Sequence, residues 1–228
     1  MQKSFSAASL GFLALGALLL GPWAAVSSGQ TIVNAGFETP NLGGGSFEYN
    51  PPTGPGQPWT FLNQSGIAID DPAQFDVSGS SSGQFAFLQM LEVNDAAISQ
   101  TINFSSAGLF TLSYLDAGRD AAGLGGDLNY HLTIQQGVSP AILSAFDSTT
   151  SGQPFTVNSY NFSVLSAGNY TLTFTAVSHA PGNGSDDTAF FDNVAVASTA
   201  PEPSSLAMML GGLGLLGCMR RFRRGQKE

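Results

Sequence analysis

The stretch SAGLFTLSY at residues 106–114 returns sixty positions later as SAGNYTLTF at residues 166–174. Each copy follows an Asn-Phe-Ser triplet, at 103–105 and at 161–163. Apolar or aromatic side chains alternate with hydroxyl side chains in both copies, which is the period of a half-buried β-strand. The Ser-Ala-Gly segments are typical of hairpin turns in which glycine adopts a left-handed conformation. Two equivalent hairpins so far apart predict a two-sheet sandwich rather than a single meander.

The repeat has two explanations, an internal duplication or one favourable hairpin reached twice, and both favour the same architecture. Short alternating runs separated by Gly or Asn continue along residues 30–197, and no segment there keeps a helical period. The predicted strands are residues 84–91, 98–104, 109–115, 129–135, 155–164, 170–177 and 189–196. Two long loops, 39–58 and 116–127, are rich in glycine, and such loops inside a compact domain are usually functional or mobile. The expected domain is therefore all-β.

The charge of this domain is strongly one-sided. The chain has 228 residues, with 16 Asp and Glu against 7 Lys and Arg. Six of the seven cations lie near the chain ends, which leaves Arg119 alone against 14 acids, a net charge of −13. Such a domain cannot neutralise phosphates, so nucleic-acid binding is excluded, and contact with an anionic membrane face is not expected. Acids in an exported domain serve solubility or Ca²⁺ binding. The only cysteine, Cys218, lies outside the domain, so no disulfide forms within it.

Both ends of the chain have the pattern of targeting segments. Residues 1–29 predict a signal peptide, with Lys3, an apolar stretch at 5–20 and small residues before the cut; a retained anchor is the alternative. Residues 198–228 contain a linker, the tripeptide Pro-Glu-Pro, an apolar run at 204–219 and an Arg-rich end at 220–224. A helix over that run is about 24 Å long, so spanning a bilayer requires snorkelling side chains or local thinning. The arginines belong on the cytoplasmic side, which places the domain outside.

This C-terminal pattern resembles the PEP-CTERM sorting signal of Gram-negative bacteria that make extracellular polysaccharide. The matching residues are Pro201, Glu202, Pro203, Arg220, Arg221, Arg223 and Arg224. The resemblance implies recognition by an exosortase, a transient stay in the inner membrane, cleavage near the tripeptide, and delivery to the cell surface or matrix. The alternative is an ordinary C-terminal anchor that happens to follow Pro-Glu-Pro.

A second resemblance covers the domain loosely. Its opening, residues 32–38 (IVNAGFE), and its ending, residues 190–196 (FFDNVAV), are similar to those of jelly-roll carbohydrate-binding modules and galactose-binding-like domains. The resemblance implies a jelly-roll sandwich in which Glu38 and Asp192 support a structural Ca²⁺. Because calcium needs six to eight oxygens, backbone carbonyls and Asp187 are expected to contribute. The alternative is that Glu38 and Asp192 only cap turns.

Sugar-binding faces combine flat aromatic rings with amide and carboxylate groups. The candidate ligand-binding residues are Tyr49, Trp59, Arg119 and Tyr130, with Gln89, Asn129 and His131 as polar companions. Trp59 has a core position as its alternative, because most aromatic side chains of a β-sandwich fill its interior. Arg119 has the alternative of anchoring a loop by pairing with Asp116, Asp120 or Asp127, or with carbonyl groups.

Catalysis has little support in the sequence. Neither His131 nor His179 lies in a nucleophile motif, and zinc signatures are missing. The sequence therefore predicts an exported, non-enzymatic protein of the cell surface or exopolysaccharide matrix, either structural or glycan-contacting. A hydrolase acting on matrix polysaccharide is the alternative, and a matrix filler without ligand is the third hypothesis.

Overall fold

The computed structural model describes residues 30–43, 46–71, 74–77, 83–91, 96–120, 125–179 and 186–199. All of them belong to one compact unit, Ser27–Pro201. They form the strands β1 (Phe47–Tyr49), β2 (Thr60–Leu62), β3 (Ser65–Ile69), β4 (Gln84–Met90), β5 (Ala97–Phe104), β6 (Gly108–Gly118), β7 (Leu128–Gln135), β8 (Leu143–Ser148), β9 (Thr156–Val164), β10 (Gly168–His179) and β11 (Asp187–Ser198).

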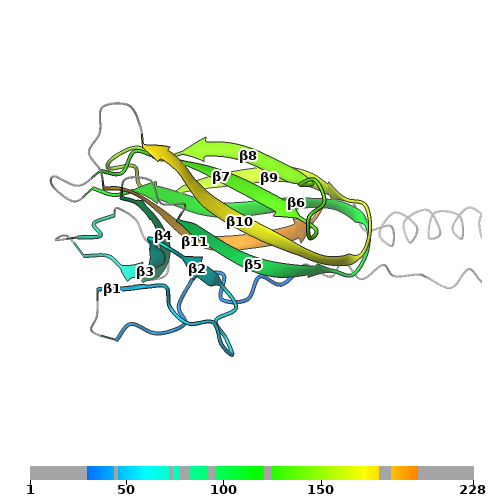
Figure 1. Ribbon diagram of the computed structural model, residues 1–228, viewed down its shortest axis with the longest axis horizontal. Helices are drawn as coiled ribbons and strands as arrows, with labels where there is room; N and C mark the ends of the chain where they lie inside the picture. The colour runs from blue at the N-terminus through cyan, green and yellow to red at the C-terminus, as the bar shows by residue number, and fades with distance from the viewer. Residues whose placement is uncertain are drawn as a thin grey trace, which may run out of the picture. The chain divides into compact units, whose positions relative to one another are not determined.

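The strands make two antiparallel sheets that pack face to face (Figure 1). One sheet has the order β1-β3-β4-β11-β6-β9 and the other has the order β2-β5-β10-β7-β8. The prediction of an all-β, two-sheet sandwich is confirmed. None of the described residues belongs to a helix of the length and apolarity that crossing a membrane requires. The predicted signal helix, the predicted transmembrane helix at 204–219 and the Pro-Glu-Pro and arginine residues lie outside the described residues.

The predicted strands correspond to β4, β5, β6, β7, β9, β10 and β11, with ends that differ by a few residues. Alternation identified β7 well, because its side chains are buried and half-buried in strict turn. The sequence missed β1, β2, β3 and β8. β1 and β2 are only three residues long, and four of the five residues of β3 are buried, so β3 shows no polar alternation. β8 is an edge strand that exposes an aromatic side chain, Phe146, which is 70% exposed, so its pattern is not apolar inside and polar outside.

The prediction that the two Ser-Ala-Gly segments close hairpins is wrong. β5 and β10 lie in the five-stranded sheet, whereas β6 and β9 lie in the six-stranded sheet. Each segment is therefore an arch that carries the chain from one sheet to the other. Gly108 pairs with Val164 and Gly168 pairs with Phe104, so the two arches lie side by side at one end of the sandwich (Figure 1). Of the two glycines in the Ser-Ala-Gly segments, Gly168 alone has a positive φ, +153°, so the predicted left-handed glycine is not found at Gly108.

The aromatic side chains of the two copies pack together beneath the arches. The Phe104 ring meets the rings of Phe110, Phe162 and Tyr170 with centroid distances of 4.8, 5.9 and 5.3 Å, each edge to face. All four are at most 5% exposed. Edge-to-face aromatic pairs stabilise the fold beyond the effect of burial alone. The aromatic residues of the repeat therefore form one end of the main core.

A carboxylate is also buried between the sheets. Asp116, on β6, is 1% exposed, and it accepts hydrogen bonds from the Tyr130 hydroxyl at 2.7 Å, Thr156 Oγ1 at 2.9 Å and Gln153 Nε2 at 3.1 Å. Tyr130 Oη in turn lies 3.1 Å from Tyr114 Oη. Burial raises the pKa of Asp116 above its ordinary value despite these donors. The network satisfies a polar group inside the core, as a buried charge requires.

Candidate functional site

The outer face of the six-stranded sheet carries a second apolar core. Its members are Ala68, Phe75, Val77, Phe85, Phe87, Ala117 and Phe190. Phe75 is not on a strand; its ring centroid lies 4.9 Å from that of Phe87 and 6.1 Å from that of Phe190. Asp70 Oδ1 accepts a hydrogen bond from the Val77 amide at 3.1 Å, which holds the segment 74–77 against the sheet. This explains why β4 is buried on both faces.

A glycine makes room for the aromatic side chain at the rim of this core. Gly66 pairs with Tyr49 on one side and with Phe87 on the other. A Cβ at Gly66 would lie 2.1 Å from the Glu48 carbonyl oxygen and 2.8 Å from the Phe87 ring. Without that Cβ, the Tyr49 ring stacks edge to face on Phe87 with centroids 5.1 Å apart. The Tyr49 side chain is 36% exposed, so one part of it rests on the core and another meets solvent.

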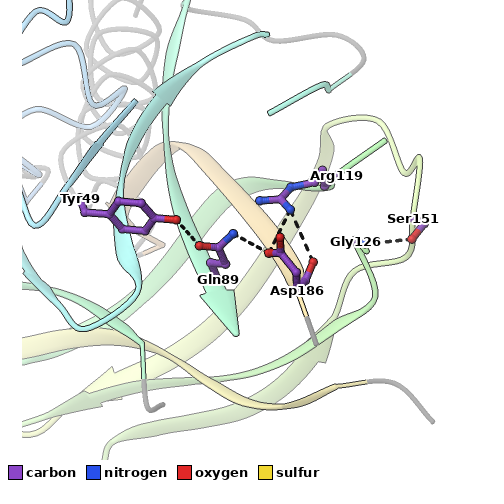
Figure 2. Close-up of polar contacts among 6 residues, drawn as sticks. All are labelled: Tyr49, Gln89, Arg119, Gly126, Ser151 and Asp186. Carbon is purple, nitrogen blue, oxygen red and sulfur yellow. Dashed lines mark hydrogen bonds and ion pairs between the residues drawn. The ribbon is translucent and has the colours of Figure 1, made fainter. Parts of the chain in front are cut away.

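Three polar side chains continue from Tyr49 along the same face, and together the four form what we call the Tyr49–Arg119 row: Tyr49, Gln89, Asp186 and Arg119. The Tyr49 hydroxyl donates to Gln89 Oε1, and Gln89 Nε2 donates to Asp186 Oδ1 (Figure 2). An Arg119 terminal nitrogen lies 3.0 Å from the same Oδ1 and 3.5 Å from the Asp186 carbonyl oxygen. The row joins β1, the end of β4, the residue after β6 and the residue before β11.

The backbone around Arg119 is fixed on two sides. Its amide donates to the Thr188 carbonyl at 3.2 Å, and its carbonyl accepts from the Gly152 amide at 3.1 Å. A Cβ at Gly126 would lie 2.5 Å from the Arg119 backbone nitrogen, so only glycine fits there. The Gly126 amide donates to Ser151 Oγ at 2.9 Å, which ties the neighbouring loop beside Arg119 (Figure 2). These contacts fix the Arg119 backbone, and the Asp186 ion pair fixes its guanidinium.

Burial and charge are unevenly distributed along the row. Arg119 is 1% exposed, and its guanidinium carbon lies 5.0 Å from the centroid of the Phe75 ring. Burial lowers the pKa of Arg119, and the Asp186 carboxylate opposes that effect; arginine nonetheless stays charged at neutral pH. Arg119 Nε is a buried donor that has no partner among the described residues. Burial, together with the Asp186 charge, raises the pKa of Tyr49, so its hydroxyl stays protonated.

The row can hold a polyhydroxylated ligand in two ways. Asp186 is 29% exposed, so its carboxylate accepts hydrogen bonds from outside while Arg119 and Gln89 hold it in position. The Tyr49 ring offers an apolar surface. Gln89 bridges the Tyr49 hydroxyl and the Asp186 carboxylate, so it sets the spacing between the ring and the carboxylate. Binding sites combine such apolar surfaces with a few fixed polar groups.

The structure brings two of the four predicted ligand-binding residues together and buries the other two. Tyr49 and Arg119 are brought together, and Gln89 links them through Asp186. Trp59 is fully buried, stacks on Phe37 at 4.9 Å and donates its indole N–H to the Asn34 carbonyl. Tyr130 is fully buried on Asp116. Trp59 therefore has the core position that was its alternative, whereas the prediction that Tyr130 contacts a ligand is corrected because its side chain lies in the core.

The two other predicted companions lie elsewhere. Because Tyr130 points into the core, Asn129 and His131 face outward from the five-stranded sheet. The His131 ring stacks on Phe146 at 4.2 Å, and Asn129 bonds Ser178 at 3.0 Å. They belong to a different face of the sandwich from the Tyr49–Arg119 row.

Sequence reasoning missed Asp186 as the partner of Arg119. The three partners that it named were Asp116, Asp120 and Asp127, which are closer in the chain. The ion pair depends on β11 lying between β4 and β6, and no local pattern reports that order. The alternative in which Arg119 also bonds a carbonyl group is confirmed by the Asp186 contact.

The three predicted metal ligands do not all lie together, because Asp187 is far from Asp192. Asp187 and Asp192 are five residues apart on β11, about 16 Å along a strand, so they do not ligate the same ion. Asp192 is buried, and its Oδ1 accepts from the Asn193 amide at 2.7 Å. Glu38 Oε1 accepts from the Gln84 amide at 3.3 Å. Within the described ranges, no three His, Cys, Asp or Glu residues gather as metal ligands do. Calcium at Glu38 and Asp192 stays a prediction.

Residues 199–224 match the PEP-CTERM protein-sorting motif. The chain carries a PEP-CTERM sorting motif. The motif implies an exported protein whose membrane-anchored precursor is sorted to the cell surface by an exosortase. No curated protein shows significant sequence similarity to the chain.

The domain is similar in fold to a solved carbohydrate-binding module. The carbohydrate-binding module TmCBM61, solved with β-1,4-galactotriose, is 15% identical, with a TM-score of 0.50 over 74% of this chain and 98% of the module. The CBM22-1 xylan-binding domain of Xyn10C from Paenibacillus barcinonensis is 12% identical, with a TM-score of 0.42 over 68% of this chain and 94% of that domain. The enzymatically active domain of tailspike protein 4 from bacteriophage CBA120 is 14% identical, with a TM-score of 0.45 over 74% of this chain and 21% of that protein. The first of these likenesses supports the jelly-roll sandwich.

Proposed function

We propose that the chain is a non-catalytic protein of the cell surface or exopolysaccharide matrix of a Gram-negative bacterium, and that it binds a neutral polysaccharide through the Tyr49–Arg119 row. The sorting motif supports the location, and the module-like fold supports glycan binding. The observation that carries the proposal is the combination of a part-exposed Tyr49 ring with an Asp186 carboxylate held by Arg119 and Gln89.

The charge of the domain favours a neutral ligand. Arg119 is the only cation among 14 acids in the domain, and its charge is already matched by Asp186. An anionic polysaccharide would be repelled by the surrounding acids, whereas hydroxyl groups donate well to a carboxylate. The β-1,4-galactotriose bound by TmCBM61 makes β-1,4-galactan a reasonable first probe.

A non-catalytic role fits the chemistry of the row. Glycosidases use two carboxylic groups, one of them with a raised pKa. Burial raises the pKa of one described carboxyl group, Asp116, and Tyr130, Thr156 and Gln153 cover it inside the sandwich. A substrate cannot reach it without opening the core.

Affinity electrophoresis of the purified full-length chain in detergent tests the proposal, with β-1,4-galactan, xylan and alginate as probes. We expect retardation by a neutral polymer and none by alginate. Tyr49→Ala and Asp186→Asn should each weaken binding by about tenfold or more, the scale of one lost contact. Phe146→Ala is the matched control, because Phe146 is an exposed aromatic residue on the other sheet.

Three results would contradict the proposal. An equal loss of polysaccharide affinity in Phe146→Ala would show that the polymer does not bind at the Tyr49–Arg119 row. If no neutral polymer retards the protein, the hypothesis of a matrix filler without ligand is favoured. Release of reducing sugars from a retained polymer would favour the hydrolase. Melting temperatures of the variants show whether they are folded under the assay conditions.

A further inference from the structure

The acidic side chains of the domain are not spread evenly over the sandwich. β6 begins at one end of the sandwich and finishes at the other, so its eleven residues separate the two ends by about 33 Å. Strand directions place a group of acids at the end where β6, β8 and β10 finish and β7 and β11 begin. These acids are Asp116, Asp120, Asp127, Asp147, Asp186 and Asp187.

The opposite end has no charged side chain among its described residues. It consists of the two arches 104–108 and 164–168, the β7–β8 turn 136–142 and the last residues of β11 with Thr199, and we call it the uncharged end. The arches lie side by side there (Figure 1). The β7–β8 turn belongs to the same end, because Thr171 near the start of β10 pairs with Gln135 at the end of β7.

Apolar side chains project from the uncharged end into solvent. Val138, in the β7–β8 turn, is 105% exposed, and Leu165, in the second arch, is 82% exposed. They are the two most exposed large apolar side chains of the described residues, and Leu109, which is 58% exposed, begins the strand after the first arch. Turns usually carry polar residues. Apolar side chains that gather on one surface, as these three do at the uncharged end, mark sites of contact with a protein or a membrane.

Both targeting segments join the sandwich at this same end. Gln30, the first described residue, pairs with Val196 near the end of β11, and the Thr199 amide donates to the Leu109 carbonyl at 2.9 Å. The apolar run of the sorting motif is predicted to begin at residue 204. Five extended residues reach at most about 17 Å. While that run lies in a bilayer, the uncharged end is the part of the domain closest to the lipid.

We propose that the uncharged end of the sandwich lies on the lipid surface in the anchored precursor, with Val138 and Leu165 at the depth of the headgroups. The occupant is a bilayer because the chain leaves this end toward its membrane segment. The clustered acids lie about 26–33 Å away, at least three times the screening length of about 8 Å at physiological salt, so anionic headgroups repel them little.

This revises the expectation that the acidic domain avoids a membrane face. The expectation followed from the net charge of −13, which averages over two unlike ends. In the proposed orientation the Tyr49–Arg119 row faces away from the membrane, because Gln89, Arg119 and Asp186 lie at the acidic end. The orientation depends on anchoring through the sorting motif and not on glycan binding, so the two proposals fail separately.

Depth-dependent quenching in vesicles tests the orientation. The full-length chain carries Cys218→Ser and one new cysteine, Val138→Cys, Leu165→Cys or the control Thr150→Cys, which lies just after β8 at the acidic end. Each cysteine is labelled with an environment-sensitive fluorophore, and the chain is inserted into phosphatidylethanolamine–phosphatidylglycerol vesicles that contain spin-labelled lipid. We expect a blue shift and strong quenching at residues 138 and 165, and neither effect at residue 150.

A charge variant provides the second measurement. Val138→Asp with Leu165→Asp places acids on the tips without touching the core, and a label at Ser105→Cys should then lose its lipid quenching while the chain still floats with the vesicles. Quenching that is equal at residues 138 and 150, or that survives the charge variant, would overturn the proposal. A blue shift that grows with protein density and lacks lipid quenching would instead indicate contact with a second copy, and would also overturn it.

Discussion

The Arg119 side chain is 1% exposed, yet it is paired at 3.0 Å with an Asp186 carboxylate that is 29% exposed. The two partners therefore depend on each other unequally. Without Arg119, Asp186 can turn toward water, whereas without Asp186 the guanidinium remains buried against Phe75 with a positive charge. Leaving a buried charge unpaired is strongly destabilising, whereas replacing it with an apolar side chain often is not.

We therefore expect Asp186→Ala to lower the free energy of unfolding by about 3 kcal/mol and Arg119→Met to lower it by about 1 kcal/mol or less. Urea unfolding at neutral pH measures both. Asp120→Ala, an exposed aspartate next to Arg119, is the control and should change little. A larger loss in Arg119→Met than in Asp186→Ala would show that the packing of the arginine stem, and not its charge, stabilises this end.

The aromatic group beneath the arches predicts a second asymmetry. Phe104→Ala removes the ring that contacts Phe110, Phe162 and Tyr170, so it should cost about 3–5 kcal/mol of unfolding free energy. Phe146→Ala removes a ring of the same size that is 70% exposed and stacks only on His131 among its aromatic neighbours, and should cost about 0.5 kcal/mol. Comparable midpoints in thermal unfolding would mean that the arches do not depend on the shared core.

The alternation in the repeat was enough to predict half-buried strands, because the face that buries Phe110 and Tyr170 is set by neighbours in sequence. The two-sheet sandwich was inferred from two hairpins, and the structure has that architecture with arches in place of the hairpins. The alternation was not enough to predict which strands pair. Hairpins and arches contain the same Ser-Ala-Gly signal, and the choice between them depends on where β9 and β10 dock.

The candidate site was predictable only in part. Tyr49 was predicted as a flat aromatic ring that can contact a sugar, and Arg119 as the lone cation of the domain. Asp186 was not predicted, because its role arises from the neighbouring positions of β4, β11 and β6. Trp59 and Tyr130 were predicted on the same ground as Tyr49, an aromatic ring. Gly66 leaves room for Tyr49 at the rim of the second apolar core, whereas Trp59 and Tyr130 are buried in the main core.

Calcium binding at Glu38 and Asp192 gives a separate test. A metal that binds only the folded state raises the melting temperature by mass action. We expect the full-length chain to melt higher in millimolar calcium than in EDTA, and Glu38→Gln to remove that difference. Glu48→Gln is the matched control, since it changes the same charge elsewhere. Identical melting curves in calcium and EDTA would contradict calcium binding at Glu38 and Asp192.

The buried Asp116 carboxyl predicts how stability changes with pH. Burial raises its pKa in the folded state above the ordinary value of 3.8, so the folded protein binds this proton more tightly than the unfolded chain does. Stability from that proton is fully present below pH 3.8 and is lost as pH rises through the folded-state pKa. Asp116→Asn does not titrate, so the unfolding free energy of the wild type relative to the variant should fall as pH rises above about 4 through the folded-state pKa. Urea titrations at several pH values measure the difference. A wild type that instead gains on the variant as pH rises would show that the bonds from Tyr130, Thr156 and Gln153 outweigh burial and hold the pKa below its ordinary value.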